Sequence, residues 1–139
     1  MPLLNNETIN QLKSAAIKAS ANAYCPYSRF VVGAAVLCES GSIYTGCNVE
    51  NASLGLTVCA ERNAVFGAVA QGETKIVAVA VYAPVDTVTA PCGACRQVIS
   101  EFNPKAEIYM FNHKELLTQV NLQELLPMAF GPSDIENPT

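Results

Sequence analysis

The segment Lys75-Ile-Val-Ala-Val-Ala-Val-Tyr-Ala83 decides the fold. It contains a short, wholly apolar run, whereas a strand with one face in water alternates apolar and polar residues. Strands that are covered on both faces have continuous apolar sequences of this kind. The segment therefore predicts a central strand with helices packed on both sides of its sheet.

Helix and strand patterns alternate along the rest of the chain. Helices are predicted where apolar residues recur at three- and four-residue steps, and strands where apolar runs lie between turns. Helix starts are marked by Asn5 or Asn6, by Thr57, by Pro91 and by the capping box Asn121-Leu-Gln-Glu124. The predicted elements, in chain order, are a helix at 5–23, strands at 30–38 and 43–49, a helix at 57–70, the strand at 75–83, a helix at 91–102, strands at 106–111 and 115–120, and a short helix from 121.

This order favours an α/β fold, a three-layer α/β/α sandwich with a central mixed five-stranded sheet. Residues 1–139 are expected to form a single domain, with a loose C-terminal tail at 131–139. The helices that begin near Cys59 and Cys92 can both present their N-termini at one edge of the sheet. Open α/β sheets bind ligands at such places.

Composition restricts the partners. The formal net charge is −4, and the eight Lys and Arg residues are scattered without a basic run. Because an acidic surface repels phosphate backbones, we expect a small neutral ligand and no nucleic-acid polymer. No apolar run is long enough to span a membrane, and the N-terminus lacks a signal-peptide pattern, so a cytoplasmic protein without a membrane partner is expected. In a reducing cytoplasm the six cysteines are expected to be free thiols rather than three disulfides.

Three of these thiols lie at two predicted helix starts. Cys92 and Cys95 are three residues apart on a first helical turn, so both sulfurs can face one point. Such a pair is either a redox dithiol or half of a zinc site. Cys59 adds a third thiol, and helix N-termini stabilise thiolates. The other thiols (Cys25, Cys38 and Cys47) lie in or beside the predicted hairpin and are interpreted as buried free thiols rather than as a fourth ligand.

Glu61 favours a catalytic interpretation of the three-thiol group. Three protein ligands leave the fourth position of zinc open for water, and a carboxylate beside that position is a general base and proton shuttle. Zinc with three thiolates carries a net charge of about −1, and Arg62, or alternatively Arg96, is placed to offset it by donating to the sulfurs. The thiols alone leave structural and catalytic zinc about equally favoured, and Cys59-Ala-Glu61 shifts the balance to catalysis. His113, the only histidine, is interpreted as a solvated turn residue, which disfavours His-dependent hydrolases.

At this point the sequence resembles a known family. Cys59-Ala-Glu61 followed by Pro91-Cys92-Gly-Ala-Cys95 is similar to the signature of the zinc-dependent nucleoside deaminases. The similarity extends from about residue 8 to about residue 135 and is specific for the small, homotetrameric cytidine deaminases. The segments that carry this specificity are Tyr24-Cys-Pro-Tyr-Ser-Arg-Phe30, Val32-Gly-Ala-Ala35, Gly46-Cys-Asn-Val-Glu-Asn51 and Leu125-Leu-Pro-Met-Ala-Phe130.

The resemblance implies a function and a set of roles. It implies hydrolytic deamination of cytidine and 2′-deoxycytidine to uridine and 2′-deoxyuridine in pyrimidine salvage, by a homotetramer with shared active sites. By this resemblance, Cys59, Cys92 and Cys95 bind one Zn²⁺ per subunit, Glu61 transfers protons, and Arg62 supports the thiolates. Asn48 and Glu50 bind the ribose 3′-hydroxyl, and Phe30 packs against the base. The backbone around Ala60 and Pro91 binds the cytosine edge, and Phe130 enters a neighbouring subunit's site.

Some features keep other interpretations open. Apart from the resemblance, Asn48 and Glu50 are a polar strand end, while Phe30 and Phe130 are core or interface aromatics. Leu54 stands where an aromatic residue is common in the family, Asn63 where Thr is more usual, and Met128 where small residues are common. These three departures bear on subunit contacts and on nucleoside affinity. The rival functions are deamination of an aminonucleoside antibiotic, a non-catalytic or structural zinc module, and polynucleotide editing.

Overall fold

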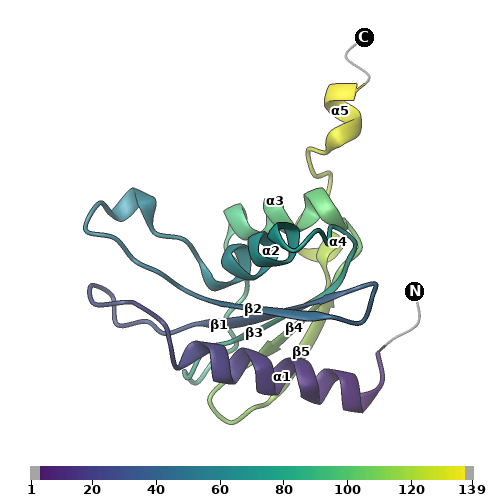
Figure 1. The fold of residues 1–139 in the computed structure, drawn as a ribbon. Helices are drawn as coiled ribbons and strands as arrows, with labels where there is room; N and C mark the ends of the chain where they lie inside the picture. Colours follow the sequence, from purple (N-terminus) through teal and green to yellow (C-terminus); the bar gives the residue numbers. More distant parts are fainter. Residues whose placement is uncertain (1–3, 137–139) are drawn as a thin grey trace.

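The computed structural model describes residues 4–136 and is shown in Figure 1. Its helices and strands follow the predicted alternation. In chain order they are α1 (Asn6–Ser20), β1 (Gly33–Cys38), β2 (Ile43–Cys47), the 3-10 helix η1 (Leu54–Leu56), α2 (Ala60–Ala70), β3 (Ile76–Tyr82), α3 (Gly93–Phe102), β4 (Glu107–Phe111), β5 (Leu117–Asn121), α4 (Leu122–Leu125) and α5 (Pro132–Glu136).

The described residues form one five-stranded mixed sheet in the order β2-β1-β3-β4-β5. The pair β3–β4 is parallel and the other three pairs are antiparallel. Helix α1 covers one face of the sheet, and α2 and α3 lie over the other face together with α4 (Figure 1). The three-layer α/β/α sandwich with a mixed five-stranded sheet is confirmed.

The central strand β3 explains why its sequence is apolar throughout. Val79 and Val81 belong to the core beneath α2 and α3, whereas Ala78 and Ala80 belong to the core beneath α1. Successive side chains of a strand point to opposite faces, so a strand between two helical layers needs apolar residues at every position. The expectation of a strand covered on both faces is confirmed.

Two glycines allow the helices to lie close to the sheet. A Cβ atom at Gly33 in β1 would lie 1.9 Å from the backbone oxygen of Ala16 in α1. A Cβ atom at Gly46 in β2 would lie 2.5 Å from the amide nitrogen of Ala64 and 2.6 Å from the carbonyl oxygen of Ala60, both in α2. Gly46 therefore sets how closely the first turns of α2 approach the sheet.

Several predicted boundaries were wrong. Helix α2 begins at Ala60 with Cys59 as N-cap, not with Thr57 as cap, because the Thr57 amide closes the η1 turn onto Leu54 at 3.2 Å and Val58 is still extended in a bridge with Val49. Helix α3 likewise begins after Cys92 rather than at Pro91. Each thiol-bearing N-cap thus lies at the helix end itself.

Smaller differences concern the ends of other elements. Helix α1 is capped by Asn5 as expected but ends at Ser20, three residues before the end of its apolar pattern, and β1 begins at Gly33 rather than at residue 30. The capping box of Asn121 and Glu124 is confirmed at α4. The segment expected to be a loose tail contains α5, and its residues 137–139 lie outside the described part of the chain.

Substitution of Gly46 by Ala tests the close approach of β2 to α2. The added methyl group would meet backbone atoms of α2 that cannot move independently, so Gly46→Ala should lower the free energy of unfolding by at least about 1–3 kcal/mol. Gly67 is the matched control, because it lies within α2 and a Cβ atom there would meet nothing within 4 Å. Gly67→Ala should stabilise the protein by about 0.5–1 kcal/mol. Equal effects of the two substitutions in urea unfolding would contradict the packing argument.

Candidate metal centre

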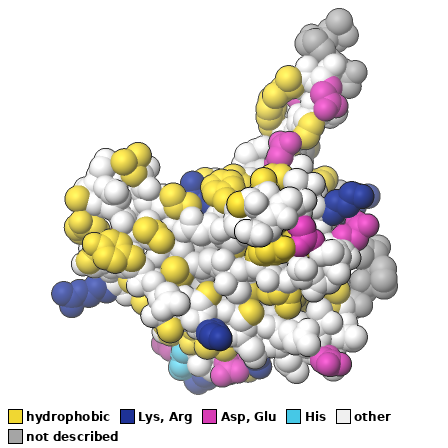
Figure 2. Space-filling view, viewed as in Figure 1, with side chains coloured by type: hydrophobic (Ala, Val, Ile, Leu, Met, Phe, Trp, Pro, Cys, Tyr) yellow, Lys and Arg dark blue, Asp and Glu magenta, His cyan; other side chains and the backbone are white. Residues whose placement is uncertain are grey.

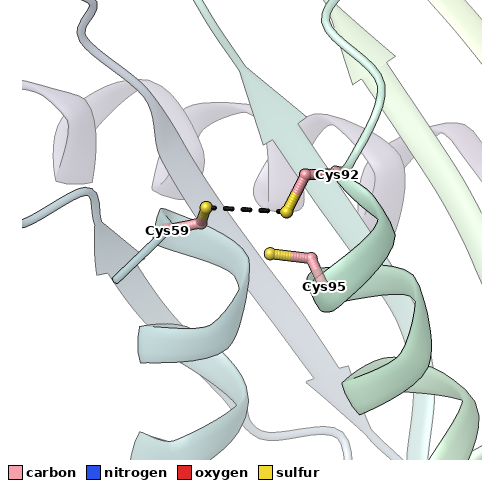
Figure 3. A group of neighbouring side chains, drawn as sticks. All are labelled: Cys59, Cys92 and Cys95. Atoms are coloured by element: carbon pink, nitrogen blue, oxygen red, sulfur yellow. Dashed lines mark hydrogen bonds between the residues drawn. The ribbon is translucent and has the colours of Figure 1, made fainter. Parts of the chain in front are cut away.

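The starts of α2 and α3 bring three thiols together. Cys59 is the N-cap of α2, Cys92 is the N-cap of α3, and Cys95 lies in the first turn of α3. The three sulfurs lie within 4.8 Å of one another, and Figure 3 shows them facing a common point between the two helix ends. The three-thiol cluster, defined by Cys59, Cys92 and Cys95, therefore joins residues that are 33 positions apart in the chain.

The three-thiol cluster fits a zinc ion in spacing and in donor chemistry. The sulfurs of Cys59 and Cys92 are 3.7 Å apart. A tetrahedral zinc with Zn–S bonds of about 2.3 Å holds its sulfur ligands about 3.8 Å apart, whereas a disulfide requires about 2.05 Å. All six cysteines are free in the structure. The cluster therefore suits a metal better than a redox disulfide, and three thiolates leave one tetrahedral position for a reactant.

The surroundings of the cluster favour a thiolate. A hydrogen bond from Cys95, followed by donation from Arg62 Nη2 at 3.5 Å, lowers the pKa of Cys59 to about 5. The same hydrogen bond, together with burial, raises the pKa of Cys95. The N-terminal ends of α2 and α3 add partial positive charge at both positions. The hydrogen bond between Cys59 and Cys95 thus favours the thiolate at Cys59 and the thiol at Cys95.

Arg62 is held against the cluster at a cost. Its Nε is the one buried side-chain nitrogen or oxygen atom between residues 4 and 136 that has no hydrogen-bond partner. The other candidate donor, Arg96, points elsewhere: it donates to the carbonyl oxygens of Pro91 at 2.7 Å and Leu125 at 2.9 Å. Arg96 therefore ties the start of α3 to the end of α4, and of the two arginines only Arg62 contacts the thiols.

Glu61 lies in the first turn of α2, directly after the thiol-bearing N-cap and its neighbour Ala60. Only 4% of its surface is exposed. Burial, with a smaller contribution from the charge of Cys59, raises the pKa of Glu61 to about 7. A desolvated carboxyl group beside a metal centre is in a position to accept and return protons.

Glu61, Cys59 and Cys92 line a pocket of about 300 Å³, whereas Cys95 is fully buried. The pocket brings together most of the residues predicted for the site, from four separate parts of the chain. Its lining consists of Ser28, Phe30, Val32, Asn48, Glu50, Thr57, Cys59, Ala60, Glu61, Thr89, Ala90 and Cys92.

Four of the predicted site residues are not among the lining residues of this pocket: Arg62, Pro91, Cys95 and Phe130. Phe130 is 59% exposed in the segment after α4, where its carbonyl oxygen accepts a hydrogen bond from Gln97 Nε2 at 2.8 Å. The carbonyl oxygen of Pro91 is occupied by Arg96. The wall beside Cys92 is formed instead by Thr89 and Ala90.

Asn48 and Glu50 reach the pocket, and both also hold the loop that carries Phe30. The Asn48 amide is buried, accepts from the Val32 amide at 3.0 Å and donates to the Phe30 carbonyl at 2.6 Å. The Glu50 carboxylate accepts from the backbone amides of Tyr27 at 2.9 Å and Ser28 at 3.1 Å. These two side chains therefore connect the end of β2 to the loop before β1.

The sequence analysis missed Ser28, Val32, Thr57, Thr89 and Ala90 as lining residues. Proximity along the chain was the available signal, since each lies within two residues of a predicted site residue. Nothing in the local sequence shows how the segment that carries Thr89 is fixed. The structure does: Asn112 Nδ2 donates to the Asp86 carbonyl at 2.9 Å, and the His113 amide donates to Val85 at 3.0 Å.

His113 lies outside the pocket, as its interpretation as a turn residue requires. It is partly exposed, between β4 and β5, and its Nε2 lies 2.8 Å from Asp86 Oδ1. Its imidazole thus has a carboxylate partner that the sequence did not indicate. The contacts of His113 with Val85 and Asp86 hold the segment that leads to Thr89, and His113 does not reach the pocket.

Comparisons with known proteins agree with this geometry. Residues 6–111 match the family model of the cytidine and deoxycytidylate deaminase zinc-binding region. The chain is 47% identical over 123 residues to a cytidine deaminase of Halalkalibacterium halodurans, which covers 88% of this chain and 93% of the relative. It is 43% identical to a cytidine deaminase of Mycobacterium tuberculosis, over 91% of this chain and 92% of the relative. The crystal structure of a cytidine deaminase from Burkholderia pseudomallei superimposes with a TM-score of 0.85 at 42% identity, over 91% of this chain and 100% of that one.

Removal of one thiol tests the metal centre. Cys95→Ser should lower the affinity for zinc by more than the roughly 10–100-fold that loss of a supporting hydrogen bond costs, because a ligand itself is lost. Cys25→Ser is the control, since Cys25 lies outside the three-thiol cluster. Zinc content after dialysis, measured by elemental mass spectrometry, and competition with a chelator give the result. Equal zinc retention by the two variants would rule out the three-thiol site.

Proposed function

The chain belongs to the cytidine and deoxycytidylate deaminase family, and from this premise we propose that it catalyses the zinc-dependent hydrolysis of cytidine and 2′-deoxycytidine to uridine and 2′-deoxyuridine, with release of ammonia. One observation carries the proposal: the buried Glu61 lines the same pocket as Cys59 and Cys92 of the three-thiol cluster. A structural zinc site has no use for a desolvated carboxyl group, whereas a hydrolytic site requires one.

We assign the metal ligands and the proton carrier as follows. Cys59, Cys92 and Cys95 would hold zinc, which when bound supplies a water acidic enough to attack C4 of the pyrimidine near neutral pH. Glu61 accepts a proton from the attacking water and delivers it to N3 of the base. It then transfers the second proton to the exocyclic amine, so that one water and one nucleoside give the keto product and ammonia. The Arg62 guanidinium offsets part of the negative charge of the thiolates by donating to Cys59.

The sugar side of the pocket supports a nucleoside rather than a free base. A carboxylate has about four acceptor positions, and Glu50 uses three of them for Tyr27 and for the amide and hydroxyl of Ser28. Asn48 likewise retains one amide hydrogen and one lone pair. We assign these remaining positions to the ribose 3′-hydroxyl. Phe30, 41% exposed on the pocket wall, would cover the base, and the backbone around Ala60 would bind its edge, whereas the Pro91 carbonyl oxygen already accepts from Arg96.

We further propose a homotetramer in which subunits share active sites. Large apolar side chains are exposed on the loops around the pocket, at Tyr24 (56%), Tyr27 (52%), Leu54 (70%) and Leu56 (65%). Figure 2 shows hydrophobic side chains gathered on the lobe that these loops form at the left of the molecule. Burial of such a surface against other copies would stabilise an assembly. Phe130 would then enter a neighbouring subunit's pocket.

The setting of the reaction is inferred from the net charge and from the described helices. A net charge of −4 suits a small neutral nucleoside and opposes binding to a polynucleotide. None of the described helices has the length and apolar character that a membrane crossing requires. We place the enzyme in pyrimidine salvage in the cytoplasm. No observation favours deamination of an aminonucleoside antibiotic, a silent zinc module or polynucleotide editing over this function.

Glu61→Gln tests the proton carrier. The amide has nearly the same size but cannot accept a proton, so the turnover rate of cytidine should fall by at least about 10²–10⁴-fold while zinc content and fold are retained. Loss of the ultraviolet absorbance of cytidine reports the rate. Glu101→Gln is the control, because Glu101 is exposed on α3 and lies outside the pocket. Turnover by Glu61→Gln at the unmodified rate would exclude the mechanism.

Shared active sites are tested by subunit complementation. Phe130→Ala should lower kcat/KM by at least about tenfold, the effect of losing roughly 1.4 kcal/mol of contact. The fold of each chain should be retained, because Phe130 is 59% exposed within its own chain. Ile135→Ala, which alters an equally exposed residue of α5, should leave activity unchanged.

Mixed oligomers test whether Phe130 acts in a neighbouring subunit. When Phe130→Ala chains are refolded with Glu61→Gln chains, some pockets receive both an intact Glu61 and an intact Phe130 from different subunits. Activity above the sum of the two separate variants is expected. Absence of this gain would show that Phe130 acts within its own chain or not at all.

A further inference from the structure

The structure assigns a positioning function to Ser28: we infer that its hydroxyl group aligns the Glu50 carboxylate for recognition of the nucleoside sugar. The inference rests on the proposed function, in which Glu50 binds the ribose 3′-hydroxyl. Ser28 lines the same pocket as Glu50, and its hydroxyl donates to Glu50 Oε2.

Three donors from two adjacent residues fix the Glu50 carboxylate. The backbone amides of Tyr27 and Ser28 both donate to Oε1, at 2.9 Å and 3.1 Å, so they hold one oxygen only. The Ser28 hydroxyl supplies the donor to the other oxygen. Without that hydroxyl the carboxylate would keep its two donors at Oε1, but Oε2 would lose the donor that fixes its direction. The orientation of the second oxygen therefore depends on one side chain.

The hydroxyl of Ser28 is itself held in place. It accepts a hydrogen bond from the Phe30 amide at 3.0 Å. Arg29, between these two residues, adopts the left-handed conformation with φ of 58°, and its amide closes the loop onto the Cys25 carbonyl at 2.9 Å. A left-handed non-glycine residue marks a backbone that is specified by its surroundings. The loop thus presents Ser28 to Glu50 and Phe30 to the pocket as one unit.

The charge state of Glu50 agrees with this function. The hydrogen bond from Ser28, followed by those from the two backbone amides, holds the pKa of Glu50 below its usual range. The group remains an ionised acceptor at neutral pH, and hydrogen bonds to ionised acceptors are stronger and more directional than those between neutral groups. An acceptor fixed in this way can separate a sugar that has a 3′-hydroxyl from one that lacks it.

A pair of substrates isolates this effect. 2′-Deoxycytidine and 2′,3′-dideoxycytidine differ only in the 3′-hydroxyl, so the ratio of their kcat/KM values measures its recognition. Ser28→Ala should reduce the ratio about 10–100-fold, the range expected when a hydrogen bond to a charged group is lost. The loss should fall on kcat/KM for 2′-deoxycytidine. Ser28→Thr, which keeps the hydroxyl, should restore the ratio to within a few-fold of the unmodified protein.

Ser40 provides a matched control. Its hydroxyl donates to Glu73 and accepts from the Ser42 amide at 3.2 Å, which is the same pattern as at Ser28, but it lies outside the pocket. Ser40→Ala should leave the substrate ratio unchanged.

The outcomes separate the inference from the proposed function. An unmodified protein that deaminates neither nucleoside would reject the proposed function and the inference with it. Deamination of both nucleosides at equal rates would reject the binding of the 3′-hydroxyl by Glu50, and hence the role of Ser28, but not the deaminase activity. Two outcomes would overturn the inference alone. In the first, the unmodified protein prefers 2′-deoxycytidine and Ser28→Ala keeps the same ratio of kcat/KM values. In the second, Ser28→Ala loses kcat/KM equally on both substrates and has a lower melting temperature.

Discussion

The structure depends on the meeting of two helix N-termini, those of α2 and α3, over the same face of the sheet. Helix α3 connects the parallel strands β3 and β4, so its start must lie beyond the end of β3. Helix α2 reaches the same place because β2 has no side chain at Gly46 to keep it away. The partial positive charge of both helix ends is then concentrated where the three thiols lie. The meeting of the α2 and α3 N-termini is therefore required both for the packing of the helices and for the three-thiol cluster.

The second requirement is a pocket wall that is rigid before any ligand binds. Asn48 and Glu50 satisfy backbone groups of the loop before β1, which would otherwise have no partners in the sheet. Such hydrogen bonds lower the entropy that binding must later remove. The same polar atoms that hold the loop retain free acceptor and donor positions toward the pocket. A side chain that appears structural in the unliganded protein can thus also belong to the binding site.

Sequence patterns predicted what depends on local physics. The apolar run of β3, the capping box at Asn121 and the cysteine spacing at α3 led to the correct layers and to the three-thiol cluster. Features that depend on contacts distant in sequence were missed or misplaced. Thr57 has good capping chemistry, but the pairing of Val58 with Val49 delays the helix. Arg96 resembles Arg62 in its position after a thiol, yet the distant Leu125 carbonyl determines its direction. The tether from Asn112 to the segment of Thr89 has no local signal at all.

Charge balance explains why Arg62 is retained in an unfavourable position. A buried nitrogen without a hydrogen-bond partner costs about 1–3 kcal/mol, and Arg62 Nε is such an atom. Three thiolates around a divalent zinc carry one excess negative charge, and the desolvated Glu61 beside them would add a second. Both helix ends point positive charge at the sulfurs, and Arg62 adds a full cation that donates to Cys59. Arg62 therefore offsets negative charge at the cluster while one hydrogen bond at its Nε remains unmade.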